Sequence, residues 1–162
     1  MDLGSGHSAR LLRYLRSAGR VARGIAVDVS LDPSVARDGI TLLEADLNGL
    51  LPLETASADV VTSIAVIEHL HRPELHVAEA HRILKPGGRL IMTTPSPRSK
   101  WILEFLAYQL HVIDEHEIRD HKHYFDEREL RQTMAAAGFR PEDVTYHGFL
   151  FGLNQLLVVT RS

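Results

Sequence analysis

The feature that most constrains the fold is a glycine-rich turn at the start of the chain, Asp2-Leu3-Gly4-Ser5-Gly6-His7-Ser8. Two closely spaced glycines after an acid are typical of the link between a buried parallel strand and the helix that follows it. Only Met1 precedes this turn in the sequence. We therefore expect an α/β fold whose first central strand is absent or is replaced by another segment or a neighbouring chain.

Helix-like and strand-like segments alternate along the 162 residues, which favours a single domain, 1–162, with a mostly parallel sheet covered by helices. The segment 59–64 is apolar without polar alternation, so we expect helices on both of its faces. Asp126, followed three residues later by Glu129, predicts a capping box. The expected strands are 24–29, 40–45, 59–64, 89–94, 143–146 and 155–160, the expected helices are 9–18, 73–84, 99–110 and 126–137, and 85–88 is expected to be a turn.

The composition excludes several functional classes. A net charge of −3 argues against a protein that binds nucleic acid through the phosphate backbone. The absence of cysteine excludes disulfides, thiolate metal sites and cysteine nucleophiles. No apolar run approaches the roughly 18 to 20 residues of a membrane span, and the first residues lack the pattern of a secretion signal. We expect a cytoplasmic protein.

Acids stand at the ends of two expected strands. Asp28 ends the strand after the glycine turn, and Asp46 follows the next one. The carboxyl ends of parallel strands share one edge of the sheet, where α/β proteins bind ligands. There, Asp28 can accept both ribose hydroxyls of an adenosine, and Asp46 can accept a hydrogen bond from the adenine amino group, although each acid alone also fits a turn cap. Together they predict a site for an adenosine-type cofactor.

Read in order, six segments resemble the motifs of class I S-adenosylmethionine-dependent methyltransferases, most closely the small type 11 group. These segments are 2–6, 27–30, 45–47, 58–70, 82–90 and 123–139. The resemblance implies a Rossmann-like three-layer sandwich whose sheet has seven strands, six parallel and the last antiparallel. Two departures are Ser8, where the family has a third glycine, and the segment 30–39, which is shorter than the family's helix at that place.

The resemblance implies S-adenosylmethionine as the cofactor and S-adenosylhomocysteine as its product. The residues that it assigns to cofactor binding are Asp2, Gly4, Ser5, Gly6, Asp28, Val29, Asp46, Leu47, Ser63, Ile64 and Val66. It also implies a small-molecule acceptor, or a glycan or lipid intermediate, held in part by an insert at roughly 96–125. The sequence identifies neither this acceptor nor the atom that is methylated.

Histidines are the candidate catalytic residues, since an imidazole is tuned to act as a general base near neutral pH. We select His69, His121 and His123 on the acceptor side, while a role for His69 in capping or packing its loop stays open. The acids and histidines between 111 and 123 fit no standard metal spacing, so we expect no metal.

Two other functions stay open. A methyltransferase-like domain that binds without turnover would explain the missing strand. A nicotinamide-dinucleotide site would use Gly4-x-Gly6-x-x-Ala9, which fits that fingerprint as well. Phe149, Leu150 and Phe151, near the last expected hairpin, are candidates for a homodimer contact of the kind that the resemblance implies.

Overall fold

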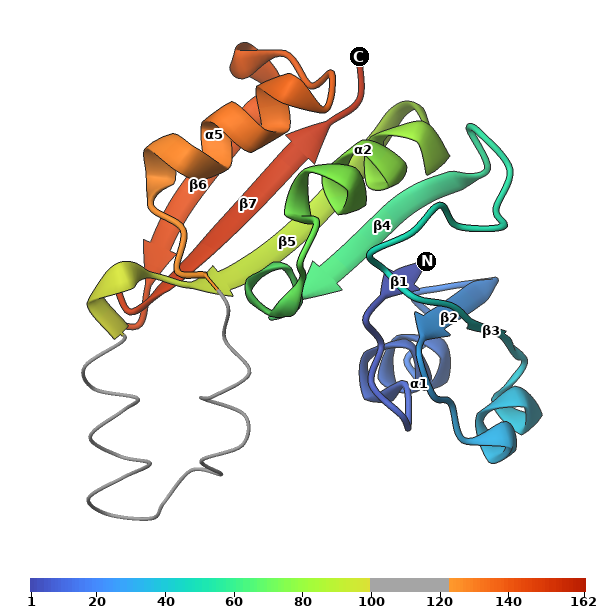
Figure 1. Ribbon diagram of the computed structural model, residues 1–162. Helices are drawn as coiled ribbons and strands as arrows, with labels where there is room; N and C mark the ends of the chain where they lie inside the picture. Colours follow the sequence, from blue (N-terminus) through green and yellow to red (C-terminus); the bar gives the residue numbers. More distant parts are fainter. Residues whose placement is uncertain (100–122) are drawn as a thin grey trace, which may run out of the picture.

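The computed structural model describes residues 1–99 and 123–162 (Figure 1). In these residues seven strands form one sheet, in the order β3-β2-β1-β4-β5-β7-β6. The strand β7 runs antiparallel to both of its neighbours, β5 and β6, and all the other pairs are parallel. The Rossmann-like α/β fold and the expected strands are confirmed. Their bounds are β1 Asp2–Leu3, β2 Gly24–Asp28, β3 Ile40–Glu44, β4 Ala58–Ile64, β5 Leu84–Pro95, β6 Val144–Phe149 and β7 Asn154–Thr160.

The central position of the sheet is occupied by β1, so the expectation that its first central strand is absent or replaced is wrong. Asp2 pairs with Ala26 on one side and with Thr62 on the other. The pairing reaches back to Met1, whose terminal ammonium donates to the Val60 carbonyl at 2.8 Å. Both neighbouring strands thus offer backbone partners to this short segment. A groove of about 620 Å³ lies beside Met1, between the starts of β2 and β4.

Residues 85–88, expected to be a turn, belong to β5 instead. The strand β5 is irregular at this point. Gly87 has a φ of +78°, and the register between β5 and β4 shifts between Ala58 and Val60. The Gly87 amide donates to the Arg161 carbonyl. A glycine accommodates this positive φ without the strain that a side chain would add.

Three α-helices are present in the described residues: α1 Arg10–Ser17, α2 Pro73–Ile83 and α5 Glu127–Ala136. The predicted capping box starts α5, because Asp126 Oδ1 accepts from the Glu129 amide and Glu129 Oε2 accepts from the Asp126 amide, both at 2.8 Å. The segment 30–39 forms a 3-10 turn, η1 Pro33–Asp38, and the expected helix 99–110 lies outside the described residues except for its first. No helix of 1–99 or 123–162 is long and apolar enough to cross a bilayer.

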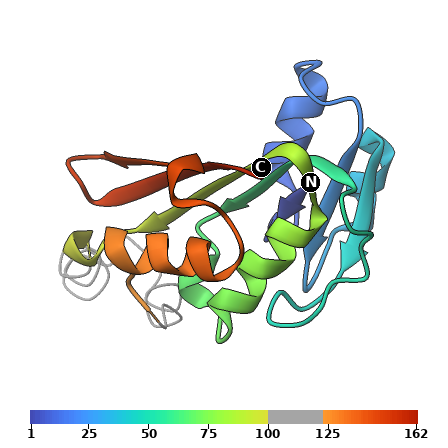
Figure 2. The same cartoon turned by 90° about the horizontal axis from the view of Figure 1, so that it is seen from above.

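One face of the sheet is covered by α2 and α5, which lie side by side on it (Figure 2). Leu3, Val61, Leu90 and Leu157 point to this face and are fully buried. They belong to the larger hydrophobic core, which α2 and α5 complete with residues such as Met134. This core fixes the sheet as one body, because the apolar rows of adjacent strands all face the same helices.

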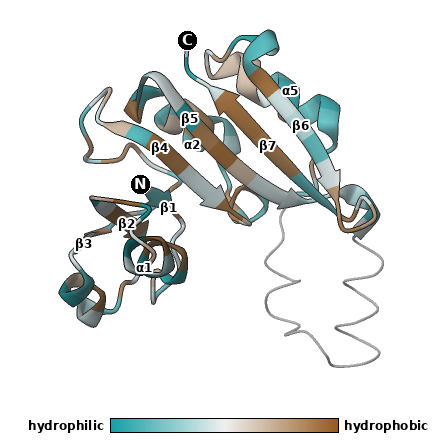
Figure 3. Cartoon of the chain, turned by 180° about the vertical axis from the view of Figure 1, so that it is seen from behind, coloured by the Kyte–Doolittle hydropathy of each residue, from teal (hydrophilic) through white to brown (hydrophobic). Residues whose placement is uncertain are grey.

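The opposite face is covered unevenly. The helix α1 and the turn η1 pack on β2 and β3 and form a second, smaller core around Leu12 and Ala26. Over β4, β5 and β7 no helix of the described residues lies on this face (Figure 3). Val60 is 40% and Ile64 39% exposed, so the expectation that both faces of 59–64 are buried is wrong.

Neighbouring valines on β4 test this asymmetry. Val61→Ala should lower the free energy of unfolding by about 2 kcal/mol, since it leaves a cavity in the larger core. Val60→Ala, on the open face, should cost less than about 1 kcal/mol. Urea denaturation of both variants measures the difference, and equal losses would show that something covers Val60 in solution.

Candidate functional site

The strand order brings the predicted cofactor residues to one edge of the sheet. The glycine turn follows β1, and its Gly4 and Ser5 amides donate to the Val27 carbonyl at 2.8 and 3.2 Å. The Ala45 amide donates to the Asp28 carbonyl at 2.9 Å, so the segment that carries Asp46 begins beside the end of β2. The ends of β3, β2, β1 and β4 therefore carry the whole predicted set, as the sequence order of glycine, acid and acid indicated.

One hydrogen bond joins the glycine turn to the acid of β2. The Gly6 amide donates to Asp28 Oδ2 at 2.8 Å, and the Val29 amide donates to Asp28 Oδ1 at 2.8 Å. Two amide donors fix the carboxylate plane, while each carboxylate oxygen can accept a further hydrogen bond. The carboxylate is thus oriented at the sheet edge and keeps capacity for ligand hydroxyls.

The glycine turn leaves room for a ligand at Gly6. A Cβ placed on Gly6, which has a φ of +69°, would meet no atom within 4 Å. The next helix, α1, begins after Ala9, which lies in the left-handed region and supplies no side-chain cap. Helix amides without a side-chain cap favour polar or anionic ligand groups. This open cradle fits a cofactor with a polar end.

Gly4 serves a different purpose, the close packing of the turn against the segment after β4. It has a φ of +77°, and a Cβ placed on it would lie 2.3 Å from Val66 Cγ2. Such a distance is impossible without movement of Val66 or of the turn. Glycine at this position therefore lets two predicted site segments touch.

The two glycines should respond differently to alanine. Gly4→Ala should lower the free energy of unfolding by about 3 kcal/mol or more, because the clash with Val66 adds to the cost of a left-handed backbone. Gly6→Ala should cost only about 1 to 2 kcal/mol, the price of that conformation alone. Thermal or urea unfolding of both variants gives the comparison, and equal costs would contradict the packing of Gly4 on Val66.

Four predicted cofactor residues have buried side chains: Asp2, Leu47, Ser63 and Val66. Asp2 accepts from Thr62 Oγ1, and burial raises the pKa of Asp2 although this hydrogen bond opposes the shift. Leu47 packs in the larger core, and Ser63 Oγ hydrogen bonds with His76 Nε2 at 2.9 Å. Val29, by contrast, is 69% exposed beside Asp28. Cofactor contacts by all of these residues stay predictions.

The imidazole of His76 is fully buried between α2 and β4, and its burial lowers the pKa to about 4. In the unfolded chain His76 therefore binds a proton near pH 6.5, whereas in the folded chain it does so only near pH 4. Stability is complete above pH 6.5 and falls as the pH drops toward 4. Between pH 7 and pH 5 we expect a loss of about 2 kcal/mol from this group.

Urea denaturation at the two pH values measures that loss. The double variant Ser63→Ala/His76→Leu removes both partners, so no polar atom of the pair is left buried alone. It should unfold with a pH dependence smaller by the same 2 kcal/mol. An unchanged pH dependence would show that His76 is accessible to protons in the folded chain.

The predicted catalytic histidines lie on neighbouring segments as far as the structure describes them. His69 ends the turn η2 Ile67–His69, three residues beyond Val66. The His123 amide donates to the Glu68 carbonyl at 3.3 Å, which holds the start of the α5 segment against η2. The His123 imidazole is half exposed, with its Nε2 3.5 Å from Glu129 Oε1. His121 lies outside the described residues.

Sequence reasoning missed two polar residues of this region, Glu68 and Asn48. Glu68 is 1% exposed, accepts from Thr94 Oγ1 at 3.1 Å, and has its pKa raised by burial. The signal in the sequence was one acid in an otherwise apolar stretch before His69. Asn48 contacts both Asp46 and the start of α2, and its signal was an amide two residues after an acid.

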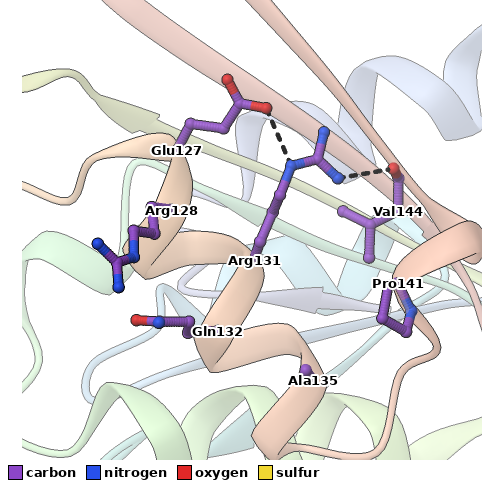
Figure 4. A pocket seen from close by; sticks show the side chains of 7 residues that line it. All are labelled: Glu127, Arg128, Arg131, Gln132, Ala135, Pro141 and Val144. Carbon is purple, nitrogen blue, oxygen red and sulfur yellow. Dashed lines mark hydrogen bonds and ion pairs between the residues drawn. The ribbon is translucent and has the colours of Figure 1, made fainter.

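A separate hollow of about 500 Å³ lies between α5 and the start of β6 (Figure 4). Arg131 crosses it, donating to Glu127 Oε1 at 2.9 Å and to the Val144 carbonyl at 3.3 Å. None of the predicted site residues lines it. Within 1–99 and 123–162, no group of three or more histidines and acids is placed to hold a metal ion.

Comparison with known proteins identifies the class to which this fold and edge belong. A family model described as a methyltransferase domain matches residues 1–144. The chain therefore belongs to the methyltransferase domain family, and the resemblance to class I S-adenosylmethionine-dependent methyltransferases is confirmed. The finer type 11 assignment stays a prediction.

Individual relatives agree with this family. A ubiquinone/menaquinone biosynthesis C-methyltransferase of Rubrivivax gelatinosus is 29% identical over 126 residues, which cover 69% of this chain and 49% of the relative. A ubiquinone biosynthesis O-methyltransferase of Idiomarina loihiensis is 32% identical over 101 residues, covering 60% and 40%. The chain spans about half, or less, of the length of the curated relatives that it matches.

Solved structures share the fold. A Haloferax volcanii protein in complex with the Trm112 methyltransferase activator superposes with a TM-score of 0.75 at 22% identity, over 99% of this chain and 80% of that one. An S-adenosylmethionine-dependent methyltransferase from Mesorhizobium loti gives a TM-score of 0.71 at 15% identity, over 99% and 89%. At these identities the likeness concerns the fold alone.

Proposed function

We propose that this protein transfers the methyl group of S-adenosylmethionine to a small-molecule acceptor or to a glycan or lipid intermediate. One observation carries the proposal: the Gly6 amide is bonded to the Asp28 carboxylate, beside an open cradle at Gly6. That arrangement combines a close approach for a polar ligand with a fixed acceptor for hydroxyls. The family of the chain supports the same reading.

The residues divide the work of binding. Asp28, fixed by two amides, accepts the ribose hydroxyls, and Asp46 accepts from the adenine amino group. The glycine turn and the start of α1 receive the polar end of the amino acid part. When bound, S-adenosylmethionine supplies a sulfonium methyl group that is already electrophilic.

Because the donor needs little activation, the chain's contribution to the reaction is orientation and exclusion of water. The segment from Val66 to His69 lies beside the glycine turn, on the acceptor side of the edge. For a hydroxyl or acidic acceptor, His69 is our first candidate to remove the proton, with His123 and His121 as the others. The bond between His123 and Glu68 supports this choice, since it holds two candidate segments together.

The acceptor class is supported by the relatives. Both quinone-biosynthesis relatives are named as methyltransferases, one for carbon and one for oxygen. Since they differ in the atom that they methylate, the likeness supports an organic small-molecule or lipid-like acceptor without selecting that atom. We also propose that 1–162 forms one cytoplasmic domain, and that the hairpin tip at Phe151, which is fully exposed, contributes to a homodimer.

Calorimetric titration with S-adenosylhomocysteine tests the proposal without an acceptor. We expect micromolar binding by the natural sequence. Asp28→Ala should weaken binding by about 100-fold or more, since two hydrogen bonds to a charged group are lost. Asp38→Asn is the control, because Asp38 is an exposed acid paired with Arg13 on the surface and should leave binding unchanged.

Each outcome decides between functions. Binding of NAD without binding of S-adenosylhomocysteine would replace the proposal with a nicotinamide-dinucleotide site. Binding of neither ligand by the folded chain would overturn the enzymatic proposal for this chain and favour a methyltransferase-like domain without turnover. Equal weakening by the Asp28 and Asp38 variants would remove Asp28 from the site.

A further inference from the structure

The segment between β3 and β4, residues 45–57, contains no helix or strand, yet it carries Asp46 and Leu47 of the candidate cofactor site. A loop of this length holds a ligand contact only if other elements fix it. In this protein the 45–57 loop contacts both ends of the helix α2. The contacts at the two ends of α2 have different partners.

At the carboxyl end of α2, Arg82 and Glu79 hold the later part of the loop. The Arg82 guanidinium donates to the Leu51 and Leu53 carbonyls at 3.2 and 2.7 Å. It also donates to both oxygens of Glu79 at 2.8 Å, and Glu79 Oε2 accepts from the Leu51 amide. The Ala56 amide then binds the Arg82 carbonyl, which satisfies one of the last carbonyls of the helix.

At the amino end of α2, a single side chain from the loop makes the contact. The residue before the helix, Arg72, supplies no side-chain cap. Asn48 Oδ1 accepts instead from the His71 amide at 2.7 Å and from the Arg72 amide at 3.1 Å. Asn48, from a distant part of the sequence, therefore holds the two residues that lead into α2.

The nitrogen of the Asn48 side-chain amide binds Asp46, the candidate adenine contact. Asn48 Nδ2 donates to Asp46 Oδ1 at 2.9 Å, and the Asn48 main-chain amide donates to the same oxygen at 2.9 Å. The two amides fix the orientation of the Asp46 carboxylate. His71, on the opposite side of Asn48, is two residues after His69. One side chain thus joins the cofactor side of the edge to the acceptor side.

We propose that Asn48 is a positioning residue that sets the Asp46 carboxylate for the cofactor and fixes it relative to the turn that carries His69. The inference rests on the proposed function, because it assumes that Asp46 meets the cofactor. Asn48 itself touches neither reacting atom. It acts through two groups, and its two hydrogen-bonding ends can be altered separately.

Two substitutions separate the ends. Asn48→Asp keeps an oxygen acceptor for the His71 and Arg72 amides, where a negative charge is favoured at a helix start. It removes the side-chain donor to Asp46, keeps the main-chain donor, and places a like charge beside that carboxylate. Asn48→Ala removes both ends. We therefore expect Asn48→Asp to keep the melting temperature close to that of the natural sequence, while Asn48→Ala lowers it.

The affinity for S-adenosylhomocysteine should not follow the melting temperature in these variants. Asn48→Asp should weaken binding by about tenfold despite its stability, the loss expected for one hydrogen bond to a charged group. Calorimetry and thermal unfolding of the same samples give both quantities. Gln132→Glu is the matched control, since it makes the same amide-to-acid change at an exposed position of α5 (Figure 4) and should alter neither quantity.

The outcomes are distinguishable. If Asn48→Asp binds as tightly as the natural sequence, the inference is wrong and the proposed function stands. If both Asn48 variants lose affinity only in proportion to their loss of melting temperature, Asn48 is a structural cap and the inference is equally wrong. If the natural sequence itself does not bind S-adenosylhomocysteine, the proposed function fails and the positioning role fails with it.

Discussion

The pairing of the two-residue strand β1 with both β2 and β4 is the constraint on which the site depends. Asp2 and Leu3 supply the backbone partners that keep two longer strands at the spacing of one sheet. Because all three strands are parallel, their carboxyl ends meet at one edge. The glycine turn leaves β1 at that edge, where Gly6 reaches Asp28 and Gly4 reaches Val66. A different central partner would separate these groups.

The sheet is stabilised mainly from one side. The larger core joins every strand except β6 and β3 through fully buried side chains under α2 and α5, whereas the smaller core extends only over β2 and β3. The same side that carries the larger core also carries α2, whose ends hold the 45–57 loop. Stability and site geometry therefore both depend on this helix layer, while on the opposite face of β4 the described residues leave Val60 and Ile64 partly exposed.

Hydrogen bonds from amide groups orient two acids of the candidate site. Asp28 is fixed by the amides of Gly6 and Val29, and Asp46 by the amide and side chain of Asn48. Such bonds fix direction as well as distance, and they persist at high salt better than exposed ion pairs do. A preorganised edge of this kind lowers the cost of ordering the site when a ligand binds.

Most helices and strands of the described residues, and the order in which their ends meet at the sheet edge, could be predicted from the sequence. Local patterns suffice for a capping box at Asp126, for glycine after a strand and for an acid ending β2, because each reports the backbone conformation of its own few residues. The sequence did not predict that Asp2 and Leu3 pair at the centre of the sheet, that the face of β4 carrying Val60 stays open, or that Asn48 binds the start of α2, more than twenty residues away. These features depend on which distant segments become neighbours in the folded chain, and local sequence patterns do not report that.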